Sequence, residues 1–594
     1  MTHSLFRRCR GLALWTLSLL LAACQSAAPA RLMTATLAPT STRAPSPVPV
    51  TQTLAPTFPA TQAPLLLSTE TPVPPTPLPS PPAALPAFTL ALPAGPASLD
   101  PAKAVDESGL LITRHMYEGL TAYAPGSTQV TPALAQAWET TDAITWTFHL
   151  RTAVLFSDGA PFTAAVAAAN VERWYRREPA GDYLFWKLMF RGFADERDEH
   201  GAPLSLLAAV NAPTPQTLVI VLSQPYAALP ATLAMPSFAM VNPAAFGQTA
   251  APGSPAPSAG TGPFILKDWT SEGLVRLMRN PNYWGAPATP DELVFKPIPD
   301  DTQRLMALDV GEVDGLARLN PKFYAAARAD AKLRVDFDPA LDVLYLGFNQ
   351  ARRPWERLDC RLAVASALDK GRYVQAFFPG DGEAADTLLP PGVWGRGSAD
   401  GAPAYDVAQA RRYWQRCRDA EPDITQRFTF YVPPAMDRPY LPLDPAPLGA
   451  AIQADLAAAG ISTTVVSPDR TMWLSDLRTG RADLFLLGSV GVNGDPDSIW
   501  CSLFCGYEPA FNSDRQGNPV APDNVLAAML LNARGTTDPA EREKLYAQAQ
   551  ARLFRTLPAI PLAYRQSAWA YRARVQGNVP SPIEDVFFGL RAGP

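Results

Sequence analysis

Two carboxyl groups, those of Asp495 and Asp497, stand two positions apart in the segment NGDPDS (493–498). Paired carboxyl groups are the catalytic apparatus of glycosidases, which place one on each side of the bond that is hydrolysed. Two groups on one short loop cannot flank a substrate in that way. We therefore keep a carbohydrate-active enzyme only as an alternative, and expect a protein that is not an enzyme.

Histidine, a common ligand of catalytic zinc and a common general base, is scarce in this sequence. The 594 residues include only His3, His115, His149 and His200. A zinc site or a Ser–His–Asp triad has little to be built from, and we expect neither a metal nor a cofactor. The formal net charge is −5. We also expect no binding to nucleic acid, which requires clustered Lys and Arg.

Four cysteines lie in the body of the chain, an even number that suits an oxidising compartment. Cys501 and Cys505, in CSLFC, are close enough in sequence for a local disulfide. Cys360 precedes one helical pattern and Cys417 lies late in another, so this pair is the second disulfide candidate. Four-thiolate zinc is the alternative, but the separations of 57, 84 and 4 residues match no zinc ribbon.

The N-terminus has the pattern of an export signal. A basic start (RRCR, 7–10) precedes an apolar run from Leu12 that ends in small residues. The run is too short to span a membrane, and this order of segments is typical of a signal peptide, which we place at 1–23. Its end, LAAC (21–24), resembles the bacterial lipobox. That resemblance implies a lipid on Cys24, whereas an ordinary signal peptide is the alternative.

Residues 24–86 form a segment rich in Pro, Thr, Ala and Ser. Such a composition cannot bury a core and favours extended polyproline II. We interpret the segment as a lipid-anchored linker that lifts a folded domain off a membrane surface. A ligand for SH3-type domains is the alternative that its PxxP repeats leave open.

The remainder of the chain, 87–594, alternates strand-like and helical patterns. Apolar strand-like runs occur at 217–222 and 483–488, and amphipathic helical spacing occurs at 408–420 and 448–460. Strands interleaved with helices indicate an α/β fold.

Capping residues predict several helix ends. Thr163 can accept the first backbone N–H bonds of a helix that runs through 169–174. Gly311 and Gly460 suit the left-handed position that often follows a helix.

Five blocks of the globular part stand in a recognisable order: SLDPAKAVDESGLLITRHMYEGLTAY (98–123), WTFHLRTAVLFSDGAPFTA (146–164), GTGPFIL (260–266), VFKPIPDDTQRLMALDVGEVDG (294–315) and YLGFNQARRPWERLDCRLAVASALDK (345–370). In this order they resemble the extracellular solute-binding proteins of the peptide/nickel ABC-transporter family. The resemblance covers almost the whole globular part. It implies a two-lobed, class II periplasmic-binding-protein-like α/β fold with an extra subdomain inserted in lobe I.

Mapped onto this chain, the resemblance implies lobe I at 87–125, 256–338 and 563–594, the inserted subdomain at 126–255, and lobe II at 339–562. The chain would cross between the lobes near Asp338 and near Leu562. A ligand would close the lobes, which requires only that the closed state bind it better.

The stretch GSVGVNGDPDS (488–498) resembles the segment that holds the peptide's amino group in the dipeptide-binding branch. That branch has Trp and Asp where this chain has Ser489 and Val492. Valine cannot pair with an ammonium group, and leaving that charge unpaired in a closed site is costly. We therefore expect free-amine dipeptides to bind poorly. Asp495 is a nearby acid, and the resemblance implies that it belongs to the architecture of the loop.

The stretch DRPY (437–440) resembles the segment whose arginine grips the ligand carboxylate in that branch, which implies this role for Arg438. A surface arginine is the alternative. Tyr345, Trp394 and Trp473 are candidate aromatic walls of the pocket, or else parts of the core. Carboxylate contact without amine contact favours an anionic or neutral solute, such as an acidic or N-blocked peptide, an organic-acid chelate or an oligosaccharide.

These observations favour a substrate-binding lipoprotein of an ABC importer, exported and lipid-anchored to the outer face of the cytoplasmic membrane. Its partners would be a small-molecule or peptide solute, the transmembrane permease subunits and, through the N-terminal lipid, the membrane. We expect a monomer. A sensor or adhesin that uses the same scaffold without transport is the other alternative.

Overall fold

The computed structural model describes residues 86–594, apart from 179–180, 182, 249–258, 425–426, 437, 507–508, 513–522, 584–585 and 593–594. The expected signal peptide (1–23), Cys24 and all but the last residue of the expected linker (24–86) lie outside the described residues. Among the helices of the described part, none combines the length and the apolar character needed to cross a membrane.

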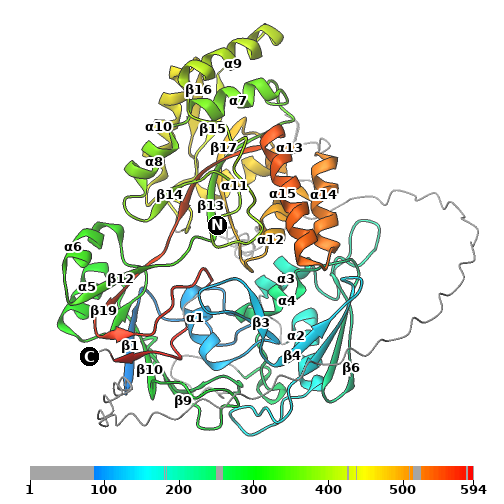
Figure 1. The fold of residues 1–594 in the computed structure, drawn as a ribbon, viewed down its shortest axis with the longest axis vertical. Coiled ribbons are helices and arrows are strands. Elements are labelled where there is room, and N and C mark those ends of the chain that lie inside the picture. The colour runs from blue at the N-terminus through cyan, green and yellow to red at the C-terminus, as the bar shows by residue number, and fades with distance from the viewer. Residues whose placement is uncertain are drawn as a thin grey trace, which may run out of the picture. The chain divides into compact units, whose positions relative to one another are not determined.

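A seven-stranded mixed sheet is the centre of what we call the first lobe (Figure 1). Its order is β12-β19-β11-β1-β10-β9-β8, with β1 (Ala87–Leu92), β8 (Phe264–Trp269), β9 (Val275–Arg279), β10 (Glu292–Pro297), β11 (Gly315–Leu316), β12 (Leu333–Phe337) and β19 (Ala568–Arg572). β1 pairs in parallel with β10 and β11. The sheet contacts α1 (Glu107–Met116), α5 (Asp301–Val310) and α6 (Tyr324–Ala329). Segments from the start, middle and end of the chain thus share one sheet.

A six-stranded sheet is the centre of the second lobe. Its order is β14-β18-β13-β17-β15-β16, with β13 (Asp342–Phe348), β14 (Gly382–Ala384), β15 (Phe428–Tyr431), β16 (Thr463–Val466), β17 (Leu484–Val490) and β18 (Ala559–Arg565). The central strand β13 is buried on both faces, because Leu344 and Leu346 pack into one core while Val343 and Tyr345 pack into another.

Helices cover both faces of this second sheet (Figure 1). The core of Leu344 and Leu346 includes side chains of α7 (Leu358–Ala367), α8 (Lys370–Phe377), α9 (Val407–Ala420) and α10 (Pro445–Ala458). The core of Val343 and Tyr345 includes side chains of α11 (Arg470–Arg478), α12 (Pro496–Phe504), α13 (Pro509–Asn512), α14 (Asn524–Gly535) and α15 (Pro539–Thr556). Burial on both faces explains why the central strands β13 and β17 contain continuous apolar runs, VLYL and LFLL, instead of an alternating pattern.

A four-stranded antiparallel sheet with its own core lies between α1 and β8 in the sequence. Its order is β4-β5-β7-β6, with β4 (Ala135–Glu139), β5 (Thr145–Leu150), β6 (Leu207–Thr214) and β7 (Thr217–Leu222). Together with α2 (Ala164–Arg176), α3 (Leu184–Phe190) and α4 (Leu229–Leu233) it forms what we call the third-sheet region. Two short pairs, β2 (Thr121–Tyr123) with β3 (Val130–Pro132) and β20 (Val575–Gln576) with β21 (Arg591–Ala592), complete the described strands.

The local patterns predicted several elements correctly. The run at 217–222 is β7, and the helical spacing at 408–420 belongs to α9. Thr163 caps the start of α2, since its side chain accepts a hydrogen bond from the backbone N–H of Val166. Gly311 follows α5 in the left-handed conformation, at φ 82°. The interleaving of helices and strands confirms the predicted α/β class.

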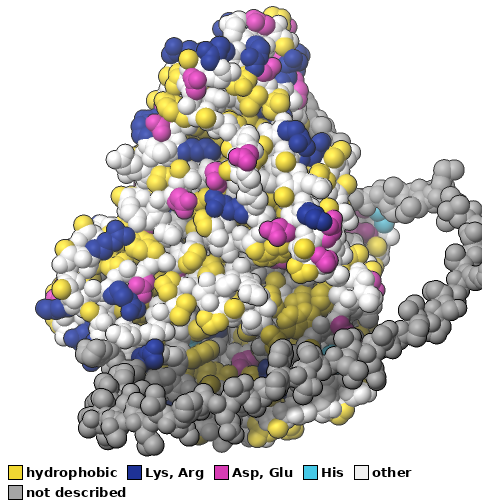
Figure 2. All heavy atoms as spheres, viewed as in Figure 1, with side chains coloured by type: hydrophobic (Ala, Val, Ile, Leu, Met, Phe, Trp, Pro, Cys, Tyr) yellow, Lys and Arg dark blue, Asp and Glu magenta, His cyan; other side chains and the backbone are white. Residues whose placement is uncertain are grey.

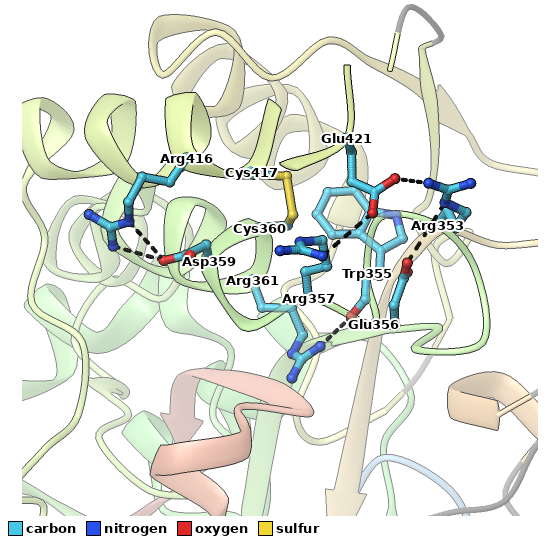
Figure 3. Close-up of a disulfide and its surroundings, with 10 residues drawn as sticks. All are labelled: Arg353, Trp355, Glu356, Arg357, Asp359, Cys360, Arg361, Arg416, Cys417 and Glu421. Atoms are coloured by element: carbon cyan, nitrogen blue, oxygen red, sulfur yellow. Dashed lines mark hydrogen bonds and ion pairs between the residues drawn. A yellow bond between two sulfur atoms is a disulfide. The ribbon is translucent and has the colours of Figure 1, made fainter. Parts of the chain in front are cut away.

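Two disulfides lie in the second lobe. Cys360 and Cys417 join α7 to α9, with their Cα atoms 5.1 Å apart, and Cys501 and Cys505 are joined across the last turn of α12. Figure 3 shows the first bond among ion pairs, including that of Arg416 with Asp359 at 2.7 Å. In the described part of the chain, no group of three or more His, Cys, Asp or Glu residues could hold a metal ion.

Charged side chains of both signs are intermingled on the face drawn in Figure 2. Blue and magenta side chains lie beside one another across both lobes on that face, with hydrophobic atoms between them.

Candidate functional site

A cavity of about 370 Å³ lies where the two lobes and the third-sheet region meet. The first lobe contributes the end of β1, one side of α1 and the segment after β11. The second lobe contributes the start of β13, the ends of β17 and β18, and the loop that contains Arg438. The third-sheet region contributes Phe185 and the chain after α4. A volume of this size suits a small organic solute.

The two crossovers between the lobes form part of the cavity wall. The first crossover, 338–341, leads from β12 to β13, and the second, 566–567, leads from β18 to β19. The backbone N–H of Asp338 donates to the carbonyl oxygen of Ser567 at 2.9 Å, so the crossovers are joined side by side. The side chain of Asp338 accepts from Trp569 Nε1 at 2.5 Å. Because β18 continues through Arg565, the return crossover follows that residue and not Leu562.

Two cations of the cavity wall are held by acids. Arg318, after β11, donates through Nε to both carboxylate oxygens of Glu107 on α1, at 2.7 and 2.5 Å. Arg565, at the end of β18, donates to Asp381 at 3.0 Å and to the carbonyl oxygen of Leu441 at 2.8 Å. These contacts fix the positions of both guanidinium groups and neutralise much of their positive charge.

Arg438 lies in the cavity wall with its side chain half-buried. A turn holds its backbone, in which Leu441 N–H donates to the Arg438 carbonyl oxygen at 3.0 Å. Within the described residues, its guanidinium has neither a hydrogen bond nor an ion pair. A half-buried fork of N–H donors that opens into a cavity is suited to a carboxylate.

Asp342, the first residue of β13, also lines the cavity, and only 7% of its surface is exposed. Its carboxyl group makes no hydrogen bond and no ion pair with a described residue. Burial raises the pKa of Asp342 to about 7, although the nearby charges of Arg318 and Arg565 act in the opposite direction. Asp342 was not among the residues predicted from the sequence. The available signal was an acid placed at the start of an otherwise apolar strand.

Val492 is the second residue that was predicted from sequence and that the structure places at the cavity. It packs against the core of the third-sheet region, and Phe185, Met235 and Pro236 also line the cavity. These side chains give the cavity an apolar wall, in contrast to the charged residues of the first and second lobes.

Ser489 and Asp495, the other two residues predicted in that stretch, do not line the cavity. Ser489 lies half-buried within β17, opposite Val343 of β13. Asp495 is 3% exposed, caps the start of α12 and forms an ion pair with Arg542. Its neighbour Asp497 pairs in the same way with Arg534. Both acids therefore hold the loop to α14 and α15.

The three predicted aromatic residues lie in the second lobe away from the cavity lining. Tyr345 and Trp473 are fully buried in the core that includes α11 to α15. Trp394 is half-buried and packs edge-on against Tyr546, with ring centroids 5.6 Å apart. The aromatic residues that line the cavity are instead Phe185 and Trp569.

Contacts also join the second lobe to residues before β8. Asn493 donates through Nδ2 to Thr232 Oγ1 at 3.1 Å, and Thr128 donates through Oγ1 to the carbonyl oxygen of Gly392 at 3.1 Å. The backbone N–H of Ala227 donates to the carbonyl oxygen of Arg534 at 2.7 Å. The loop that contains Val492 is thus held between the second lobe and the third-sheet region.

Comparison with known proteins gives the chain its family. The family described as "Bacterial extracellular solute-binding proteins, family 5 Middle" matches residues 129–510. The chain is 32% identical over 480 residues to di/tripeptide-binding protein 4 of Pseudomonas aeruginosa, which covers 79% of this chain and 88% of that protein. It is 27% identical over 519 residues to heme-binding protein A of Haemophilus influenzae, covering 83% and 90%.

A solved structure shares the fold. The structure of HbpA2 from Haemophilus parasuis superposes with a TM-score of 0.76 at 25% identity, over 86% of this chain and 100% of that chain. The predicted two-lobed periplasmic-binding-protein-like fold is confirmed. The chain belongs to the bacterial extracellular solute-binding proteins of family 5.

Proposed function

We propose that this protein captures a short peptide or a peptide-like solute in the cavity between its lobes and delivers it to the permease of an ABC importer. The observation that carries this proposal is a cavity of about 370 Å³ in a chain whose relative at 32% identity is named for di- and tripeptides. The family resemblance of the whole globular part supports delivery to a permease. Binding and release leave the solute chemically unchanged.

Arg438 would hold the carboxylate of the solute. Its half-buried guanidinium lines the cavity and has no described partner, whereas Arg318 and Arg565 are already held by Glu107 and Asp381. A charge-assisted hydrogen bond to a carboxylate contributes about 1.5–3 kcal/mol. The apolar wall that includes Phe185 and Val492 would contact a side chain of the solute.

Export and anchoring complete the proposal. The basic and apolar N-terminal segment would direct export, and the lipid on Cys24 would hold the protein at the outer face of the membrane as a monomer. The Pro-rich linker would give the folded domain reach to its permease. The two disulfides agree with an oxidising location.

Calorimetry with the purified full chain, freed of co-purified solute by reversible denaturation, tests this function. We expect at least one member of a panel of di- and tripeptides to bind with a Kd on the order of micromolar, about −8 kcal/mol. Haem is titrated in parallel and followed by its absorbance. Binding of haem, with no binding of any peptide or N-blocked peptide, would contradict the proposal.

A further inference from the structure

We propose that the carboxyl group of Asp342 pairs with a positively charged amino group of the bound solute. With Arg438 holding a carboxylate, the cavity would then select zwitterionic solutes, such as peptides with both termini free. This inference rests on the proposed function and names the second polar contact of the same cavity.

The position of Asp342 supports this role. It opens β13 directly after the first crossover, and its backbone is fixed opposite Val490 of β17, which also lines the cavity. A side chain at the start of a central strand is rigidly placed. Its carboxyl group is more than nine-tenths buried, and the cavity is the space that it borders.

The charges around Asp342 leave it without a partner among the described residues. Arg318 is bonded to Glu107, and Arg565 is bonded to Asp381, so neither cation is directed at this acid. Arg438 and Tyr440, from the loop after β15, are the other ionisable groups nearby, and neither is bonded to it. The cavity therefore contains one acid and one base that no described residue pairs.

The energetics of burial explain what the missing partner should be. An ionised carboxylate that leaves water without a compensating partner costs several kcal/mol. The raised pKa of Asp342, about 7, reflects that cost. A solute ammonium group that enters the cavity would form an ion pair with Asp342 and would keep its carboxyl group ionised.

This arrangement changes the expectation that was based on Val492. The dipeptide branch places its amine-binding acid at that position, and valine cannot replace it. Asp342 lies on another strand and offers the same chemistry to the same cavity, while Val492 belongs to the apolar wall. The resemblance pointed to the position of Val492 alone, and the fold supplies an acid from a distant part of the chain.

The experiment compares free and blocked amines on wild-type and variant proteins. Full chain is titrated with a panel of apolar dipeptides and with their N-acetylated forms at pH 7.5. We expect N-acetylation to weaken binding to the wild type at least tenfold. Asp342→Asn should weaken binding of the free-amine dipeptide at least tenfold and leave the N-acetylated form unchanged.

Asp336→Asn is the matched control, because Asp336 lies in β12, outside the cavity, in an ion pair with Arg334. It should leave both affinities unchanged. If Asp342→Asn does not fold, the comparison of free and N-acetylated dipeptides on the wild type still tests whether the cavity selects a free amino group.

Equal affinity for free and N-acetylated dipeptides would overturn the role of Asp342 while leaving the proposed function intact. So would an Asp342→Asn protein that binds the free-amine dipeptide as tightly as the wild type. Failure of both forms of every dipeptide to bind would overturn the inference together with the proposed function.

Discussion

The carboxylate of Asp495 and the guanidinium of Arg542 face each other in a two-point ion pair, with both nitrogen–oxygen distances at 2.9 Å. Both side chains are buried, and Arg542 also donates to the hydroxyl oxygen of Tyr546. This geometry makes the pair a fastening between the start of α12 and α15. An acid engaged in this way is not available to a solute.

Replacing Asp495 should therefore reduce stability more than it reduces affinity. Asp495→Ala leaves Arg542 as a buried charge without its partner, which costs about 3–5 kcal/mol. We expect a clear drop in the thermal unfolding temperature, with solute affinity retained by the folded fraction. Asp359→Ala, which breaks an exposed pair with Arg416, should cost about 1 kcal/mol or less. A variant of Asp495 with wild-type stability and no affinity would contradict this interpretation.

Replacing Arg438 tests the carboxylate contact. Arg438→Ala should weaken binding of a peptide with a free C-terminus by about tenfold to a hundredfold, the equivalent of about 1.5–3 kcal/mol. The same variant should bind the C-terminally amidated peptide as the wild type does, because that ligand lacks the partner of the guanidinium. An equal loss for both ligands in calorimetry would point to a structural role.

The affinity of the wild type for free-amine peptides should fall as the pH is lowered from 7.5 to 5.5. Asp342, with a pKa of about 7, gains a proton in this range, while the α-amino group of the peptide stays charged. We expect roughly a tenfold loss or more. Asp342→Asn should bind weakly and with little dependence on pH, which separates this acid from Glu107. A flat profile for the wild type would count against the pairing.

Asp342 should also lower the stability of the protein at alkaline pH. Its folded-state pKa lies above the ordinary value for Asp, so the neutral form is favoured in the folded state. The contribution to stability is full below pH 4 and is lost as the pH rises to about 7. Asp342→Asn should therefore unfold at a higher temperature than the wild type at pH 8, with a smaller difference at pH 5. Thermal scans without peptide at both pH values measure this.

The two disulfides should differ in their effect on stability. In the chain-entropy account, closing a 57-residue loop between Cys360 and Cys417 stabilises by about 4 kcal/mol, whereas the four-residue separation of Cys501 and Cys505 gives about 2 kcal/mol. We expect the double variant Cys360→Ala/Cys417→Ala to unfold at a lower temperature than Cys501→Ala/Cys505→Ala. The reverse order would show that native-state packing outweighs loop length.

Anchoring depends on one sulfur atom outside the described residues. Cys24→Ser should move the protein from the membrane fraction to the soluble fraction, because no acyl chains can then be attached. Fractionation of cells that express the full chain measures this. Retention of the variant on membranes would contradict the lipid anchor.

Local sequence was enough for much of the fold. Thr163 and Gly311 set helix ends through their own backbone and side-chain geometry, so their positions were predictable without tertiary information. The order of family blocks supplied the two-lobed arrangement. Arg438 and Val492 could be predicted to line the cavity because neighbouring residues resemble a known segment.

The rest of the site depends on tertiary burial. Tyr345 stands in a strand that is buried on both faces, so its sequence does not say which neighbours its ring contacts. Asp342 is informative only because Arg318 and Arg565, distant in sequence, are both held by other acids. Pairing among residues that lie hundreds of positions apart leaves no local pattern.

The hydrogen bond between Asp338 and Ser567 joins the two crossovers between the lobes side by side. A rotation about the joined crossovers would move Asp342 and Arg438 with the second lobe and leave Glu107 and Arg318 with the first lobe. The wall of the cavity is therefore complete only while the two lobes face each other. Release of the solute would then require rotation at a few backbone angles and no chemical step.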